Sequence, residues 1–103
     1  MQAALVKMHG EPAGVLEKSL NEYRFTYLQN YKGEAISLTL PVREDPYLFS
    51  QFPSFFDGLL PEGPQLEGLL RDRKIDRDDH MSQLVAVGED LVGAATVYEY
   101  NDD

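Results

Sequence analysis

The chain has 103 residues, of which 18 are acidic and 9 basic, so its net charge at neutral pH is −9. Such a charge repels phosphate backbones, and direct binding of DNA or RNA is therefore not expected. A hydrophobic content of 43% with 11% aromatic residues is that of a globular chain, and this length suffices for one domain with a modest core.

Apolar and polar residues alternate in the first forty residues, a period typical of β-strands. The predicted strands lie at residues 4–8, 15–18, 23–27 and 36–40. Turn-forming residues separate them at positions 9–14 and 30–33. Pro41 ends the last of them, because proline has no backbone N–H to donate. The short connections favour an antiparallel meander.

The periodicity becomes helical after Pro46. The three apolar stripes are Phe52, Phe55, Phe56, Leu59 and Leu60, then Leu66, Leu69 and Leu70, then Met81, Leu84 and Val85. Asp76, Asp78 and Asp79 offer N-caps for the third helix, which is expected to stop near Gly88. With a last strand at residues 95–100, we expect one α+β domain over residues 1–103. It would be a small, mostly antiparallel β-sheet with two or three short helices packed on one side.

Most of the negative charge lies in the second half of the chain. Residues 57–103 contain twelve acidic and four basic side chains, whereas residues 1–56 contain six and five. This surface suits a basic partner protein, although charge also serves solubility alone. No apolar run approaches the roughly 18 residues of a membrane span, and none has the length of a signal peptide. Because cysteine is absent, disulfides and thiol chemistry are excluded, which fits a cytoplasmic protein.

The sequence offers no catalytic or metal site. The two histidines, His9 and His80, lie in turn or capping contexts and are expected at the surface. The acidic run at residues 76–80 resembles a calcium loop superficially. Met81 and Val87 stand where that loop needs its glycine and its closing glutamate, so helix capping is the better interpretation.

Nucleotide-binding motifs are also missing. There is no G-x-G-x-x-G and no G-x-x-x-x-G-K-[ST] segment to hold phosphates, so we expect no cofactor. Phe56-Asp57-Gly58 shares two letters with the D-F-G motif of kinases, but it lies in an apolar helical stripe and no H-R-D loop occurs. We therefore expect that this chain is not an enzyme.

The break between the first two helical stripes is the best candidate for a binding site. It consists of Leu60, Pro61, Glu62, Gly63, Pro64 and Gln65. A corner held by two prolines loses little entropy on binding, so it can present Glu62 and Gln65 as a rigid probe. The phenylalanine and leucine stripe around it is more typical of a core than of an interface.

Four blocks of the sequence resemble the N-terminal subdomain of HipA-type toxin kinases, in the same order. They are GVLEK at 14–18, ISLTLP at 36–41, FFDGLLPEG at 55–63 and VGEDLVGAATV at 87–97. In HipA-like proteins this unit sits beside the N-lobe of a Ser/Thr kinase that phosphorylates aminoacyl-tRNA synthetases. In split, tripartite HipBST-type toxin–antitoxin systems it is a separate HipS-like antitoxin, and a third gene encodes a helix-turn-helix DNA-binding protein.

The resemblance implies that this chain is a stand-alone, HipS-like antitoxin that binds and inhibits a HipA/HipT-like kinase. Several relatives carry a bulky aromatic residue directly after LPEG, whereas this chain has Pro64 and no tryptophan. A large ring cannot plug the kinase here. Inhibition by Glu62 or Gln65, by the acidic C-terminal half or by restraint of the kinase lobes remains open.

The alternative is a non-inhibitory assembly or stabilising subunit that links the kinase to a HipB-like helix-turn-helix protein. An enzyme and an acidic mimic of DNA fit these residues less well. A neighbouring kinase gene fits both leading hypotheses. Toxicity of that kinase alone, relieved by this chain, would distinguish them.

Overall fold

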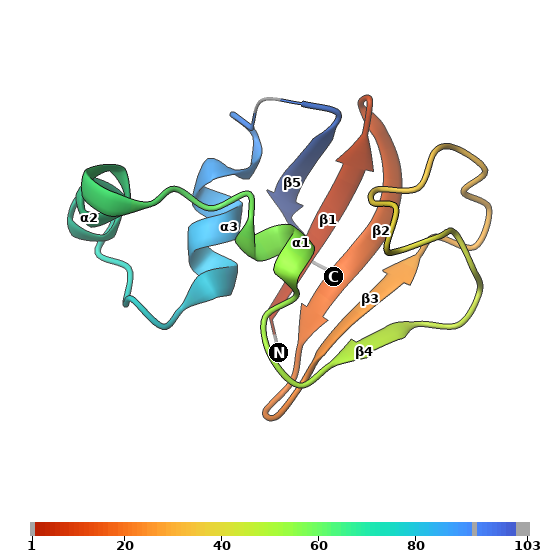
Figure 1. The fold of residues 1–103 in the computed structure, drawn as a ribbon, viewed down its shortest axis with the longest axis horizontal. Coiled ribbons are helices and arrows are strands. Elements are labelled where there is room, and N and C mark those ends of the chain that lie inside the picture. Colours follow the sequence, from red (N-terminus) through yellow and green to blue (C-terminus); the bar gives the residue numbers. More distant parts are fainter. Residues whose placement is uncertain (1, 92, 101–103) are drawn as a thin grey trace.

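A computed structural model describes residues 2–91 and 93–100 (Figure 1). Five antiparallel strands form one sheet in the order β4-β3-β2-β1-β5. The strands are β1 (Gln2–Met8), β2 (Glu11–Lys18), β3 (Tyr23–Tyr27), β4 (Tyr47–Phe49) and β5 (Ala95–Glu99). The helices are α1 (Ser54–Asp57), α2 (Gly63–Arg73) and α3 (His80–Gly88). This confirms the predicted α+β fold class.

One face of the sheet forms the core. Successive side chains of a strand point to opposite faces, so every second residue is buried. The largest fully buried side chains are Phe25, Phe56, Leu16, Met81, Leu84, Gln83, Val6 and Val97. They come from the sheet and from α1 and α3, which lie against it (Figure 1). On the opposite face Leu5, Val15 and Tyr98 stay partly exposed.

Helix α2 is set apart from this core. None of its side chains is fully buried. In Figure 1 it lies beyond α3, away from the sheet. The prediction that the helices pack on one side of the sheet therefore describes α1 and α3, whereas α2 neighbours α3. No helix of the described residues is long and apolar enough to cross a membrane.

The predicted strand at residues 36–40 is wrong. This segment is a turn in which Leu40 N–H donates to the Ser37 carbonyl at 3.0 Å, and Leu38 is fully exposed. The hydroxyl of Tyr27 accepts a hydrogen bond from Ile36 N–H at 3.0 Å and donates to the Leu40 carbonyl. Because both ends of the segment are bound to one side chain, it curls instead of extending. The fourth strand is the three-residue β4, which the sequence pattern missed.

The first apolar stripe forms a shorter helix than predicted. Helix α1 covers only Ser54–Asp57; Phe52 precedes it, and Gly58 caps its C-terminal end. Phe56 is fully buried, and the rest of the stripe packs against the core while staying partly exposed. These phenylalanines and leucines thus serve the core.

Helix α3 begins and ends as predicted. Asp79 is its N-cap and Gly88 its last residue. A Cβ added at Gly88 would lie 2.0 Å from the carbonyl oxygen of Val97, so only glycine lets the helix pass β5 here. Met81 and Leu84 are buried as expected, whereas Val85 is only half-buried.

Candidate partner-binding site

The six residues of the predicted site are here called the LPEGPQ turn (Leu60–Gln65). They comprise the end of the connection from α1 to α2 and the first residues of α2. Leu60 packs against the core, and its N–H donates to the Asp57 carbonyl at 3.1 Å. Pro61 is half-buried, and the four residues that follow are exposed. The turn is therefore anchored at its start and open to solvent from Glu62 onward.

Backbone geometry fixes how the turn enters α2. Gly63 has φ of +59°, a left-handed conformation that strains other residues, although a Cβ there would meet no atom within 4 Å. Pro64 follows in the first turn of α2, where its missing N–H costs no helical hydrogen bond. The two prolines thus restrict the backbone of this corner, and Gly63 supplies the left-handed conformation at the start of α2.

Glu62 is the charged group of the turn. It is the N-cap residue of α2, with extended backbone at φ −131° and ψ 165°, and its side chain makes no capping hydrogen bond. Its exposed carboxylate is thus available to a partner. It also lies at the helix end where the macrodipole favours negative charge.

Helix α2 has no fully buried side chain, and its polar side-chain contact to the rest of the fold is an exposed ion pair. The guanidinium of Arg77, in the loop before α3, forms an ion pair with the Glu67 carboxylate of α2. At the far end of the helix, Lys74 adopts a left-handed φ of +56°, and its N–H donates to the Leu70 carbonyl. Helix α2, and with it the turn, is therefore less firmly held than α3.

The two histidines and the acidic run at residues 76–80 make contacts within the fold. His9 Nε2 lies 3.0 Å from Glu34 Oε2, and both side chains are largely exposed. The His80 ring is stacked on Phe52 with centroids 5.1 Å apart. In the described part of the chain, no group of three or more histidine, aspartate or glutamate side chains could hold a metal ion.

Asp79 caps α3, as the sequence predicts for this run. Its carboxylate accepts hydrogen bonds from Ser82 N–H at 3.1 Å and from the Ser82 hydroxyl at 2.7 Å. Burial acts to raise the pKa of Asp79, but the Ser82 hydrogen bonds, together with Gln2 and the charge of Lys18, outweigh it and the pKa lies below its ordinary value. The Asp79 carboxylate therefore stays charged and caps the N-terminal end of α3.

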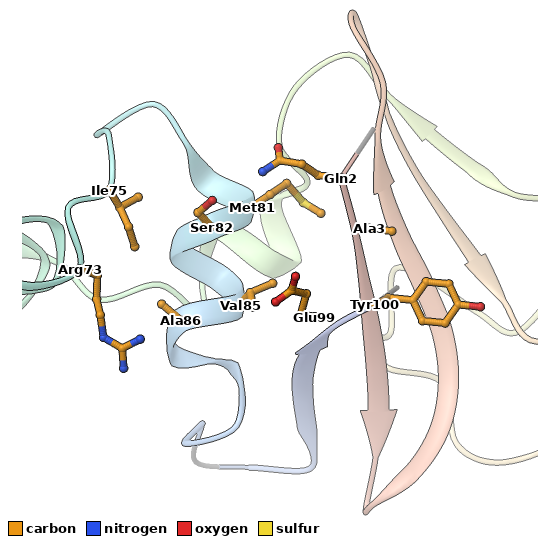
Figure 2. Close-up of a pocket in the computed structure, with 10 residues that line it drawn as sticks. All are labelled: Gln2, Ala3, Arg73, Ile75, Met81, Ser82, Val85, Ala86, Glu99 and Tyr100. Carbon is orange, nitrogen blue, oxygen red and sulfur yellow. The ribbon is translucent and has the colours of Figure 1, made fainter. Parts of the chain in front are cut away.

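A second feature, which no sequence pattern indicated, is a groove of about 410 Å³ beside α3 (Figure 2). We call it the α3–β5 groove. Ile75, Met81, Val85 and Ala86 supply its apolar part. Its lining also includes residues at the start of β1 and at the end of β5. Because separate stretches of the chain contribute one or a few residues each, no local motif could reveal it.

The fold and the exposed turn define a small α+β domain with a projecting α1–turn–α2 element. The family model of the HipA N-terminal domain matches residues 4–98, and the chain belongs to this family. A solved structure, the N-terminal domain of HipA toxin, has a TM-score of 0.78 and 25% sequence identity. That match covers all of this chain and 96% of the other.

Two relatives are similar over nearly the whole chain. An uncharacterized protein of Haemophilus influenzae is 27% identical over 99 residues, covering 96% of this chain and 93% of its own length. A putative kinase of Sinorhizobium fredii, Y4dM, is 32% identical over 113 residues, covering 95% of this chain but only 27% of its own length. The resemblance to the HipA N-terminal domain is thereby confirmed. Residues 4–98 correspond to that domain.

Proposed function

We propose that this chain is a HipS-like antitoxin that binds and inhibits a HipA/HipT-like Ser/Thr kinase toxin in the cytoplasm. The observation that carries the proposal is the exposed LPEGPQ turn. Its residues from Glu62 to Gln65 are accessible, whereas the phenylalanines beside it are used in the core. An accessible corner with a backbone restricted by two prolines is a suitable element for reaching into a partner of a HipA N-terminal domain.

The residues of the turn favour inhibition through binding to charged groups of the kinase active site, and not through blocking that site with a bulky side chain. Kinase active sites contain a lysine and metal ions that neutralise the phosphates of ATP. The Glu62 carboxylate can pair with such cationic groups, and the Gln65 amide can donate and accept hydrogen bonds. Pro64 offers no large ring, so this mode of inhibition relies on Glu62 and Gln65.

A second candidate is a non-inhibitory assembly subunit that links the kinase to a HipB-like helix-turn-helix DNA-binding protein. The observation that favours it is the partly exposed sheet face with Leu5, Val15 and Tyr98, a surface separate from the turn. Apolar side chains left partly exposed together are a feature of interaction surfaces.

The test is phosphate transfer by the cognate kinase with and without an equimolar amount of this chain. Glu62→Ala, Pro64→Ala and Gln65→Ala probe the turn. Glu89→Ala, an exposed site after α3, is the matched control for the loss of one negative charge. Inhibition that the turn variants relieve and the control retains supports the proposal. Tight binding with unchanged or raised activity contradicts inhibition and favours the assembly subunit.

A further inference from the structure

Leu38 is a fully exposed apolar side chain on a turn that is tied to the core. Its exposed fraction of 101% is the largest among the large apolar side chains of the described residues. The turn at residues 36–40, here called the Leu38 turn, is held by the Tyr27 hydroxyl, which binds the Ile36 N–H and the Leu40 carbonyl. Because water surrounds this leucine, covering it with another apolar surface is favourable.

An uncharged groove lies beside this turn. It has a volume of about 440 Å³, and its lining combines Thr39 and Leu40 of the Leu38 turn with residues 49–55, from β4 to the start of α1. We call it the β4–α1 groove. None of the nine described residues that line it is charged, although charged residues make up 26% of the chain. The groove therefore suits an apolar side chain.

Three phenylalanines give the groove its apolar surface. Phe49, Phe52 and Phe55 line it, and each is half-buried. The Phe52 ring packs edge-on against Tyr23 with centroids 5.4 Å apart, and the Phe55 ring packs edge-on against Phe56 with centroids 5.1 Å apart. Contacts within the fold thus place these rings, and each ring keeps an accessible part that can contact an apolar side chain.

These features favour a second copy of the chain as the occupant. In a symmetric contact, each copy gives and receives the same group, and a protruding leucine beside an apolar groove supplies both halves of such a contact. Two copies with a net charge of −9 each repel one another. The Leu38 turn and the groove lie within residues 1–56, where six acidic and five basic side chains nearly cancel, so the repulsion is smallest at this surface.

We propose that this chain forms a symmetric dimer in which Leu38 of each copy enters the β4–α1 groove of the other. Stable interfaces bury about 1,200–2,000 Å² in total, and two leucines with two grooves cover less, so this dimer is weak and reversible. The inference does not depend on the antitoxin function, because it requires no kinase.

Sedimentation velocity of the full chain, from about 10 µM to about 1 mM, measures self-association. Leu38→Glu places a carboxylate at the centre of the contact and should weaken the dimer at least about tenfold. Leu20→Glu is the matched control, because Leu20 is 97% exposed in the turn between β2 and β3 and receives the same charge. Circular dichroism checks that both variants are folded.

Cross-linking locates the contact. The chain contains no cysteine, so Leu38→Cys carries a unique thiol that is labelled with a benzophenone maleimide, mixed with unmodified chain enriched in ¹⁵N and irradiated. We expect cross-links from position 38 to residues 49–55 of the ¹⁵N-labelled copy, found by mass spectrometry. Leu20→Cys, labelled in the same way, should give none to this segment.

Three results would overturn the proposal. They are a chain that stays monomeric at the highest concentration, equal self-association of the Leu38→Glu and Leu20→Glu variants, and cross-links from position 38 that avoid residues 49–55 of the second copy. If the chain stays monomeric and Leu38→Glu instead weakens binding to the cognate kinase, the β4–α1 groove and Leu38 serve the kinase and not a second copy.

Discussion

The side-chain amide of Gln83 donates a hydrogen bond to the main-chain carbonyl of Arg77 at 2.9 Å. It donates a second one to the Asp76 carbonyl at 3.2 Å, and the Gln83 side chain is only 2% exposed. The guanidinium of Arg77 in turn pairs with Glu67 of α2. Gln83 thus ties the loop before α3 to the core, and the exposed ion pair of Arg77 extends this connection to α2.

Gln83→Ala is expected to destabilise the fold and to loosen α2. Loss of the amide removes two hydrogen bonds from a buried position, which costs about 1–3 kcal/mol. The free energy of unfolding is measured in urea, and amide exchange in α2 by NMR. Gln29→Ala, at an exposed position, should change neither. Equal exchange rates in α2 for both variants would contradict the proposed link.

Two glycines should respond to alanine in opposite directions. Gly88→Ala brings a methyl group against the Val97 carbonyl and should cost roughly 1–3 kcal/mol. Gly68→Ala meets no atom within 4 Å in the interior of α2 and should stabilise by about 0.5–1 kcal/mol. Thermal unfolding of both variants measures the difference. A stabilised Gly88→Ala protein would show that α3 does not approach β5 this closely.

Tyr27→Phe should destabilise the loop between β3 and β4. The change leaves the buried Ile36 N–H without its acceptor and the Leu40 carbonyl without its donor, at a cost of about 1–3 kcal/mol. Tyr47→Phe removes an exposed hydroxyl that donates to the Pro41 carbonyl at 2.6 Å, and should cost less than about 1 kcal/mol. Urea unfolding compares them. Equal losses of unfolding free energy in the two variants would contradict a special role of the Tyr27 hydroxyl.

Asp79 should make stability depend on pH in acid. Its pKa is lowered in the folded state, so its carboxylate stabilises the fold above the ordinary pKa of 3.8. This contribution is lost as the pH falls below that value, through the folded-state pKa. Asp79→Asn keeps a good N-cap but cannot titrate, so its stability should fall less in this range. Urea unfolding from neutral pH to about pH 3 tests this, with the exposed Asp78→Asn as control.

Strands and caps whose structure is decided locally were predictable from sequence. The alternation in Tyr23–Tyr27 predicts β3 to the residue. One of the three aspartates offered as N-caps, Asp79, begins α3, and the helix ends at Gly88 as expected. The segment at 36–40 alternates equally well, yet it curls because the Tyr27 hydroxyl, nine residues before Ile36, binds both ends of it. A contact of that kind leaves no trace in the local pattern.

The candidate site also has a part that the local sequence predicts and a part that it does not. The break in the helix before α2 follows from Pro61, Gly63 and Pro64, which act on their own backbone. The α3–β5 groove is formed by segments that meet only in the folded chain, so neighbouring residues do not encode it. The separation of α2 from the sheet also escaped prediction, since Leu66, Leu69 and Leu70 have the spacing of a core-facing helix.

The antiparallel pairing of β1 with β5 has a topological consequence. Ala4 lies opposite Glu99, so the polypeptide enters and leaves this unit at neighbouring points. If a gene fusion or a gene fission occurs at the end of β5, it makes or breaks a single chain connection. No other segment of the fold has to be rearranged. Circular permutants that join Gln2 to Tyr100 by a short linker should therefore fold. The same unit can then serve as an appended module or as a detached one without any change in its interior.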